Sequence, residues 1–443
     1  MSASFKDYRA YVVAALLVLS LLFFFWRTVT SPTDIRDYQS IDQLKKIHML
    51  LVGDPFALAI QNAAVQIEEA SGFKVIIERV GYNDCRTLAL LNSRGAVSKY
   101  DIVSFDVVWM GEYAKNSILL ELNKWFDTFP ALKEGDFIER AYQASSYAGK
   151  QYGIPIQPHA ELLWCRRDLF EEAGIALPVT TDDALKAAAH FHSPDDNMYG
   201  ICWNAQRGQA LGQSVAHFYA AFGQPLIDSD GRPSLDTPRG LQVAQYLLEL
   251  QKYSPPDILS MAWDLRVSRF SGGYAAMTYG WSGRSYLAEE DPYSRVSGKV
   301  EYIPAPHSAD SIPVTPLGCW SLGIPANIAD ESRDAAVEFL AWIAGDDAQH
   351  IIALHGNGGI ALHSLLQDAQ LQRRFPALAT INTLGQRGAL DDSMRPAIPQ
   401  WPRLAEILGT VFHDMLAGLI EPEEALRQAQ SAAEKLFEGQ VKD

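Results

Sequence analysis

Short apolar stretches alternate with longer amphipathic ones from residue 47 onwards. The apolar stretches predict strands at 47–52, 74–80 and 101–106. Apolar positions at helical spacing predict two helices between them, one at 56–70 before Gly72 and one at 84–91 with Asp84 as its cap. Because this alternation builds parallel sheets through right-handed crossovers, we expect an α/β fold.

The stretch from 150 to 168 is apolar but carries Pro155 and Pro158. Prolines at this density exclude a helix and disfavour a central strand, so we interpret the stretch as an extended crossing between two bodies. Beyond it, the pattern predicts strands at 274–279, 300–306 and 311–324. It predicts helices at 168–173, 182–192, 235–253, 332–343, 346–354 and 404–419, and a last helix that begins at Pro422.

The amino-terminal segment has a different pattern. Lys6 and Arg9 precede an apolar run over residues 11–26, in which Ser20 is the one polar residue. A buried core helix would show a polar stripe, so the run indicates an export signal or a membrane anchor. No small-x-small cleavage site and no lipidation cysteine follow it. The pattern therefore favours an uncleaved transmembrane helix over residues 10–29.

Composition narrows the partners. The formal net charge of −16 would repel a phosphate backbone, so we expect no nucleic-acid partner. The four cysteines, Cys85, Cys165, Cys202 and Cys319, form no Cys-x-x-Cys motif, and disulfides and buried thiols remain equally open. We predict no cofactor and no metal site.

Nucleotide binding and catalysis leave signatures that this chain lacks. Residues 53–56, after the first strand, have neither three spaced glycines nor a Gly-Lys-Ser/Thr ending, and Asp54 would repel a phosphate. No Gly-x-Ser-x-Gly, His-Glu-x-x-His or Ser-x-x-Lys signature is present. We therefore expect a protein that is not an enzyme. A glycoside-active enzyme stays open as an alternative, because it needs only two carboxylates among 53 acidic residues.

Five ordered sequence blocks resemble those of the family 1 extracellular solute-binding proteins, the sugar-binding components of bacterial ABC importers. The blocks are YDIV at 100–103 with LLEL at 119–122, GKQYGIP at 149–155 with RDLFEEAG at 167–174, FSGGYAAM at 270–277, PLGCWSLGIP at 316–325, and RPAIP at 395–399. The resemblance covers residues 47–440. Cys319 and the loop at 356–360 depart from the family pattern, so the identity of the ligand cannot be read from the sequence.

The resemblance implies a two-lobed periplasmic binding protein fold (type II) with discontinuous lobes joined by hinge strands. One lobe would comprise 45–155 with 307–345, and the other 156–306 with 346–443. Residues 1–32 would form a cytoplasmic stub and anchor, and 33–45 a tether. The implied protein is a monomer on the periplasmic side of the inner membrane that delivers a carbohydrate or polyol to ABC permease subunits. A cleaved, soluble periplasmic form and a membrane-anchored carbohydrate sensor are the alternatives.

Sugar sites combine aromatic plates with polar groups in the plane of the ring. The resemblance places Trp281, Trp320 and Trp109 as candidate plates. Asp106, at the carboxyl end of a predicted strand, could accept two hydroxyls. The remaining candidates are His159 and Glu161, whose alternate positions on the crossing could face a cleft, and Arg395 in the last block.

Overall fold

A computed structural model describes residues 45–313, 315–391 and 394–438. Of the described residues, those from Ile47 onwards form one compact unit, called the body below. The predicted anchor at 10–29 lies outside the described residues. Within the described ranges, no helix is both long enough and apolar enough to cross a membrane.

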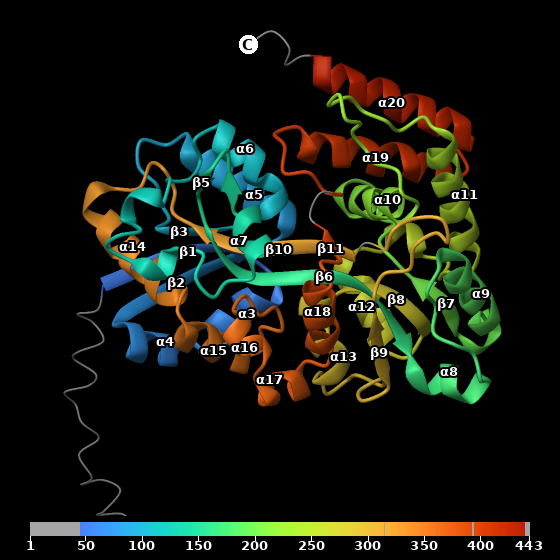
Figure 1. Ribbon diagram of the computed structural model, residues 1–443, viewed down its shortest axis with the longest axis horizontal. Coiled ribbons are helices and arrows are strands. Elements are labelled where there is room, and N and C mark those ends of the chain that lie inside the picture. The colour runs from blue at the N-terminus through green and yellow to red at the C-terminus, as the bar shows by residue number, and fades with distance from the viewer. Residues whose placement is uncertain (1–44, 314, 392–393, 439–443) are drawn as a thin grey trace, which may run out of the picture. The chain divides into compact units, whose positions relative to one another are not determined.

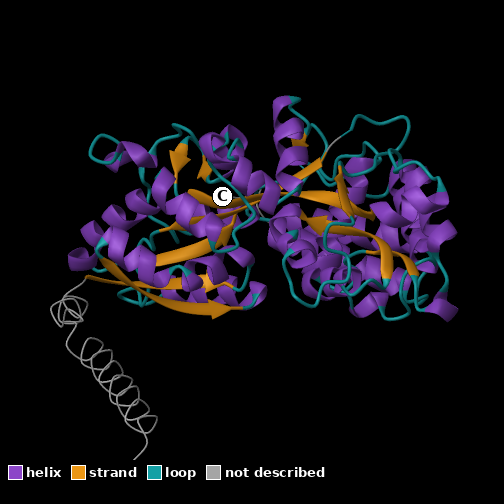
Figure 2. Cartoon of the chain, turned by 90° about the horizontal axis from the view of Figure 1, so that it is seen from below, coloured by secondary structure: helices purple, strands orange, loops and turns teal. Residues whose placement is uncertain are grey.

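The body contains two lobes that share one sheet (Figure 1). Viewed after a 90° turn, strands pass between two groups of helices (Figure 2). The sheet of the first lobe has the order β2 (Phe73–Val80), β1 (Lys45–Val52), β3 (Ile102–Asp106), β10 (Thr315–Gly323) and β6 (Ile154–Arg166). The second lobe places β6 between β9 (Val300–Ile303) and β8 (Ala275–Trp281), with β7 (Tyr199–Cys202) outermost.

The predicted β-α-β-α-β series is present in the first lobe. Strands β1 and β3 are parallel, and β10 runs antiparallel to β3. The predicted helix at 56–70 is two helices, α3 (Pro55–Asn62) and α4 (Ala64–Ser71), because the backbone of Ala63 leaves helical geometry. Gly81 rather than Asp84 precedes the next helix, α5 (Tyr82–Ser93), and Asp84 lies in its first turn.

Strand β6 is the crossing predicted at 150–168, and it is a buried strand of 13 residues. From Ile154 to Ala160 it pairs with β10, and pairing with β8 begins only at Glu161. Pro155 and Pro158 therefore lie where β6 is an edge strand, a position that tolerates a missing backbone donor. The expectation that prolines keep this segment out of a sheet centre fails for its second half, which contains no proline.

The remaining elements cover the two faces of the sheet. In the first lobe they are α6 (Met110–Lys115), α7 (Glu139–Ala144), α14 (Asp330–Ile343) and α15 (Asp346–Leu354), with the hairpin β4 (Ser146–Tyr147) and β5 (Lys150–Gln151). In the second lobe they are α8 (Arg167–Ala173), α9 (Thr181–Phe191), α10 (Gln209–Ala221), α11 (Pro238–Lys252), α12 (Trp263–Ser271), α13 (Tyr286–Glu289), α18 (Ala377–Gln386), α19 (Trp401–Leu416) and α20 (Pro422–Glu438). The connecting elements are α16 (His363–Leu366), α17 (Ala369–Arg374) and β11 (Leu390–Asp391).

Two packing details differ from the pattern-based expectation. Helix α15 packs on α3 and α4 of the first lobe, although we placed residues from 346 onwards in the second. Its buried residues are Ala348, Gln349, Ile352 and Ala353. All four cysteines are buried free thiols, which decides between the two alternatives left open for them.

Helix α19 lies unusually close to α10. A Cβ atom on Gly212 would come within 1.9 Å of the Ala405 carbonyl oxygen, and one on Gly409 within 1.8 Å of the Gly208 carbonyl oxygen. Only glycine permits this approach. These contacts hold α19 close against α10.

Candidate ligand-binding site

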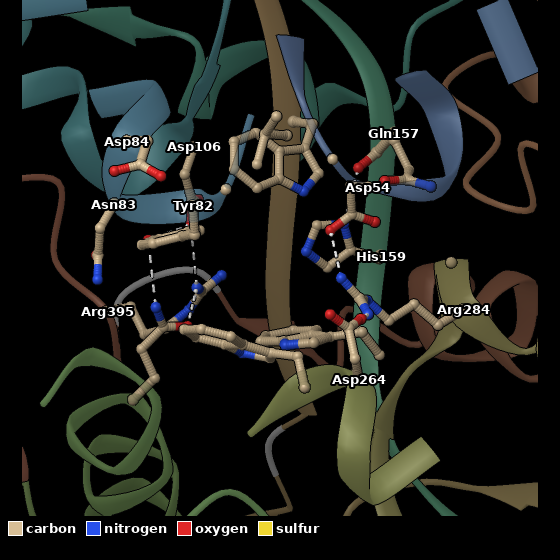
Figure 3. A pocket seen from close by; sticks show the side chains of 18 residues that line it. Asp54, Tyr82, Asn83, Asp84, Asp106, Gln157, His159, Asp264, Arg284 and Arg395 are labelled. Carbon is tan, nitrogen blue, oxygen red and sulfur yellow. Dashed lines mark hydrogen bonds and ion pairs between the residues drawn. The ribbon is translucent and has the colours of Figure 1, made fainter. Parts of the chain in front are cut away.

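A pocket of about 390 Å³ opens between the two lobes (Figure 3). Its lining includes five of the seven predicted residues, Asp106, His159, Trp281, Trp320 and Arg395. The other lining residues are Val52, Gly53, Asp54, Gly81, Tyr82, Asn83, Asp84, Gln157, Gln213, Trp263, Asp264, Gly283 and Arg284.

Three neighbouring strands align one row of pocket residues. Trp320 on β10 is paired with Asp106 on β3 and with Gln157 on β6. Directly paired residues project from the same face of a sheet. The row therefore brings an indole, a carboxylate and an amide together from positions far apart in the sequence.

The wall from the first lobe is aromatic. Tyr82, at the start of α5, packs edge-on against Trp320 with ring centroids 5.8 Å apart. Its hydroxyl donates to Asp106 Oδ2 at 3.0 Å. Burial raises the pKa of Asp106, against the lowering effect of Arg395 and of the Tyr82 hydroxyl.

The wall from the second lobe carries Trp281, at the end of β8, and Trp263, at the start of α12. The Trp263 ring lies 5.2 Å from the Tyr82 ring across the cleft. The Gln213 amide nitrogen on α10 reaches the Tyr82 hydroxyl at 3.2 Å. The two lobes are thus in contact around the pocket.

Arg395 lies at one end of the pocket (Figure 3). It donates to Gln213 Oε1 at 3.2 Å and to the Leu317 carbonyl oxygen at 3.1 Å. Its guanidinium stacks over the Trp281 ring at 4.8 Å. The nearest distance to Asp106 Oδ2 is 3.8 Å, and the Arg395 Nε atom has no hydrogen-bond partner among the described residues.

Arg284 lies at the opposite end (Figure 3). Its Nη2 atom is 3.1 Å from Asp54 Oδ2 in the first lobe, and its Nη1 atom contacts Asp264 Oδ1 in the second. Burial alone would lower the pKa of Arg284, but these two carboxylates outweigh it and raise the pKa. Arg284 therefore stays charged and is held by protein groups on both sides of the cleft.

The pocket floor is formed by β6. His159 Nδ1 lies 2.8 Å from the Gln157 carbonyl oxygen and donates to it, so Nε2 is the acceptor of a neutral ring. Burial, followed by the Arg395 charge, lowers the pKa of His159 to about 3. Gly318 leaves room for both groups, because a Cβ atom there would lie 2.5 Å from His159 Nε2 and from Arg395 Nη2.

The Gln157 side chain is fully buried, yet neither of its amide atoms has a hydrogen-bond partner within the described ranges. Its position is fixed by close backbone, since a Cβ atom on Gly359 would lie 2.3 Å from Gln157 Cγ. A buried amide without partners costs about 1–3 kcal/mol. A ligand hydroxyl group both donates and accepts, so it can satisfy either atom.

Two predicted residues do not line the pocket. Trp109 is buried behind Trp320, with ring centroids 5.6 Å apart. Glu161 lies in the interior of the second lobe, 2.6 Å from Arg266 Nη1 and 3.5 Å from His217 Nδ1. Burial would raise the pKa of Glu161, but Arg266 and His217 outweigh it and lower the pKa to about 2.

Glu161 fails as a cleft residue for a structural reason. Residues 159 and 161 would share a face of a regular strand. However, β6 changes partners between Ala160 and Glu161, so the strand passes from the pocket floor into the second lobe at that point.

Five further pocket residues were not predicted from the sequence: Tyr82, Gln157, Gln213, Trp263 and Arg284. Tyr82 could have been predicted, because it begins a helix that follows a predicted strand. Gln213 and Trp263 could not, because their helices, α10 and α12, were not predicted.

Comparisons with known proteins agree with this geometry. The sequence model of the bacterial extracellular solute-binding protein family matches residues 54–350. A probable amino-acid ABC transporter periplasmic-binding protein of Sinorhizobium fredii is 24 % identical over 387 residues, which are 86 % of each chain. The mannitol-binding protein of Pseudomonas aeruginosa is 23 % identical over 351 residues, 74 % of this chain and 79 % of that one.

A solved structure provides the corresponding comparison of folds. The solute-binding protein of an Agrobacterium radiobacter ABC transporter, in complex with ribitol, superposes with a TM-score of 0.84 at 28 % identity. The match covers 89 % of this chain and 99 % of that one. The two-lobed fold expected from the sequence is therefore confirmed.

Proposed function

Because the chain belongs to the family of bacterial extracellular solute-binding proteins, we propose that it captures a small carbohydrate or polyol in the pocket and delivers it to the permease of an ABC importer. The observation that carries this proposal is the pairing of aromatic walls from both lobes with the buried, unpartnered Gln157 amide. Aromatic faces cover the C–H surface of a sugar, and polar groups between them meet its hydroxyls.

The charges in the pocket favour a neutral ligand. Arg284 is bound by two carboxylates, Arg395 donates to Gln213 and lies 3.8 Å from Asp106, and His159 is uncharged at neutral pH. An amino acid would bring a carboxylate and an ammonium group, each of which needs an opposite charge when buried. The names of the mannitol-binding relative and of the ribitol complex support a polyol, whereas that of the Sinorhizobium relative points to an amino acid. The ligand screen must therefore include both classes.

A binding screen with product analysis tests the proposal. The full-length chain, purified in a detergent without a sugar headgroup, is titrated calorimetrically with ribitol, D-mannitol, D-glucose, maltose and a set of amino acids. We expect a carbohydrate or polyol to bind and to raise the melting temperature, since a ligand of the folded state stabilises it. The ligand should be recovered unchanged. A response to amino acids alone, or any product, would refute the proposal.

We also propose that the body acts as a monomer held to the periplasmic face of the inner membrane by residues 10–29. The unbroken apolar run without a cleavage site supports the anchor. Alkaline extraction of membranes should leave the protein in the pellet, and the purified chain should retain its amino terminus. Release of a shortened chain into the soluble periplasmic fraction would contradict the anchor. Light scattering in detergent tests the oligomeric state.

A further inference from the structure

The Asp54–Arg284 ion pair is a bridge across the cleft. Asp54 precedes α3 in the first lobe, and Arg284 follows β8 in the second. The two side chains are only 14 % and 11 % exposed, and their charged atoms are 3.1 Å apart. The bridge forms one end of the pocket, as the position of both side chains in Figure 3 shows.

A second cavity adjoins this end. It is a groove of about 270 Å³ whose lining includes Pro55 and Tyr286. Pro55 directly follows Asp54, and Tyr286 is two residues from Arg284. Asp54 and Arg284 line the pocket, while Pro55 and Tyr286 line the groove. The bridge therefore stands at the end of the pocket nearest the groove.

The groove has the chemistry of a site for another sugar unit. Tyr286 offers an aromatic ring, and Asn62 offers an amide on the opposite lobe. Arg374 closes its far side, where it binds both carboxylate oxygens of Glu290 and the Leu354 carbonyl oxygen. Like the pocket, the groove is bordered by residues of both lobes.

The pocket alone suits a short ligand. Its volume of about 390 Å³ is close to the lower limit of the roughly 300–1,000 Å³ found for small-molecule sites. Joined to the groove, the cavity would be more than half as large again. The two cavities share none of the described lining residues, and the bridge lines the end of the pocket next to the groove.

We propose that the Asp54–Arg284 bridge sets the length of the ligand, so that the protein accepts a single sugar unit or polyol and rejects a two-unit ligand. This inference rests on the proposed function. Removing the bridge should open the pocket into the groove and admit a second unit there. The bridge is thus a specificity determinant of the pocket as well as a contact between the lobes.

The test compares ligands of one and two units on the full-length chain in the same detergent. The variant is the double substitution Asp54→Ser with Arg284→Ser, since removal of one partner alone would leave a buried charge uncompensated. The double substitution Arg239→Ser with Asp310→Ser, which removes an ion pair outside the lining of both cavities, is the matched control. Ribitol, D-mannitol and D-glucose are the one-unit probes, and maltitol and maltose are the two-unit probes. Dissociation constants are measured by calorimetry.

We expect the wild type and the Arg239→Ser, Asp310→Ser control to bind a one-unit probe and to discriminate against the two-unit probes. In the double variant, the ratio of two-unit to one-unit affinity should rise by about tenfold or more. Taking the ratio removes any general weakening from poorer lobe closure. Equal binding of both lengths by the wild type, or an unchanged ratio in the double variant, overturns the length role and leaves the proposed function intact. Binding of no carbohydrate by the wild type overturns both.

Discussion

The two arginines at the ends of the pocket are held in different ways. Arg284 contacts two carboxylates, Asp54 and Asp264, so its charge is compensated within the protein. Among the described residues, Arg395 has one carboxylate within 4 Å, that of Asp106 at 3.8 Å, and its Nε atom has no hydrogen-bond partner. A guanidinium with an uncommitted donor in a buried pocket is suited to recognition, whereas one saturated by carboxylates is suited to closure.

The surroundings support this division. Arg395 is bordered by groups that a sugar can use, the Trp281 ring and the neutral His159. Arg284 lines the end of the pocket where its near neighbour Tyr286 belongs to the lining of a second cavity. Residues of the same type at two ends of one pocket thus have separate tasks, and each task can be tested alone.

Replacement of Arg395 should have the largest effect on binding. Arg395→Met removes the ligand donor and leaves Asp106 buried without its countercharge, which should weaken ligand binding by about 2–5 kcal/mol. Arg395→Lys keeps the positive charge but loses the planar guanidinium. Its ligand affinity should therefore lie between those of the wild type and Arg395→Met. Calorimetric titration with the best ligand of the screen measures both. Binding by Arg395→Met at wild-type strength would end the distinction between the two arginines.

Trp281→Ala tests the plate beside Arg395. Loss of the stacked ring should weaken binding by about 1–3 kcal/mol and leave the fold intact. Trp125→Ala is the control, because Trp125 lies outside the pocket lining. The same titrations and circular dichroism spectra serve for both variants. Equal losses in the two variants would show that the effect is not local.

Gln157→Leu should weaken ligand binding without lowering the stability of the ligand-free protein. Ligand affinity should fall by about 1–2 kcal/mol, since hydroxyl partners of the amide are lost. The ligand-free melting temperature should not fall, because an unpartnered buried amide is replaced by an apolar group. Gln349→Leu is the contrast: Gln349 is buried but donates to the Ile343 carbonyl oxygen at 3.0 Å, so that variant should be less stable. A stability loss in Gln157→Leu that matches Gln349→Leu would contradict the assignment.

The change of stability with pH gives the smallest expected effect, counted for each pH unit. Folded His159 takes up a proton only near pH 3, whereas the unfolded chain does so near 6.5. Stability should therefore be lost as the pH falls below about 6.5, at up to about 1.4 kcal/mol per pH unit. His159→Gln should reduce this slope between pH 6.5 and 4.5. In this range Glu161 adds little to the slope, because its pKa in the unfolded chain is 4.5.

Urea unfolding at several pH values measures the slope. His190→Gln, at an exposed position on α9, is the control and should keep the wild-type slope. An unchanged slope in His159→Gln would mean that the ring binds its proton at the same pH in the folded protein as in the unfolded chain. That result would contradict the effect of burial and of Arg395 on His159.

The candidate residues show how far sequence reasoning reached. Asp106 and Trp320 were predicted from separate blocks, and the structure pairs them directly across β3 and β10. Glu161 was predicted from strand alternation, which assumes that one strand keeps one environment along its length. Because β6 changes its partner strand from β10 to β8 at this residue, the assumption holds for His159 and fails for Glu161.

The sequence by itself determined the α/β alternation, the extended crossing, the apolar amino-terminal run and five of the residues that meet in the pocket. These features are local, because they depend on apolar periodicity and on short blocks within a few turns of chain. Only the tertiary structure decided that Tyr82 faces Trp263 across the cleft and that Asp54 meets Arg284. Such contacts join residues about 180 and 230 positions apart, and their geometry depends on strand register and on the packing of two lobes, which no local pattern encodes.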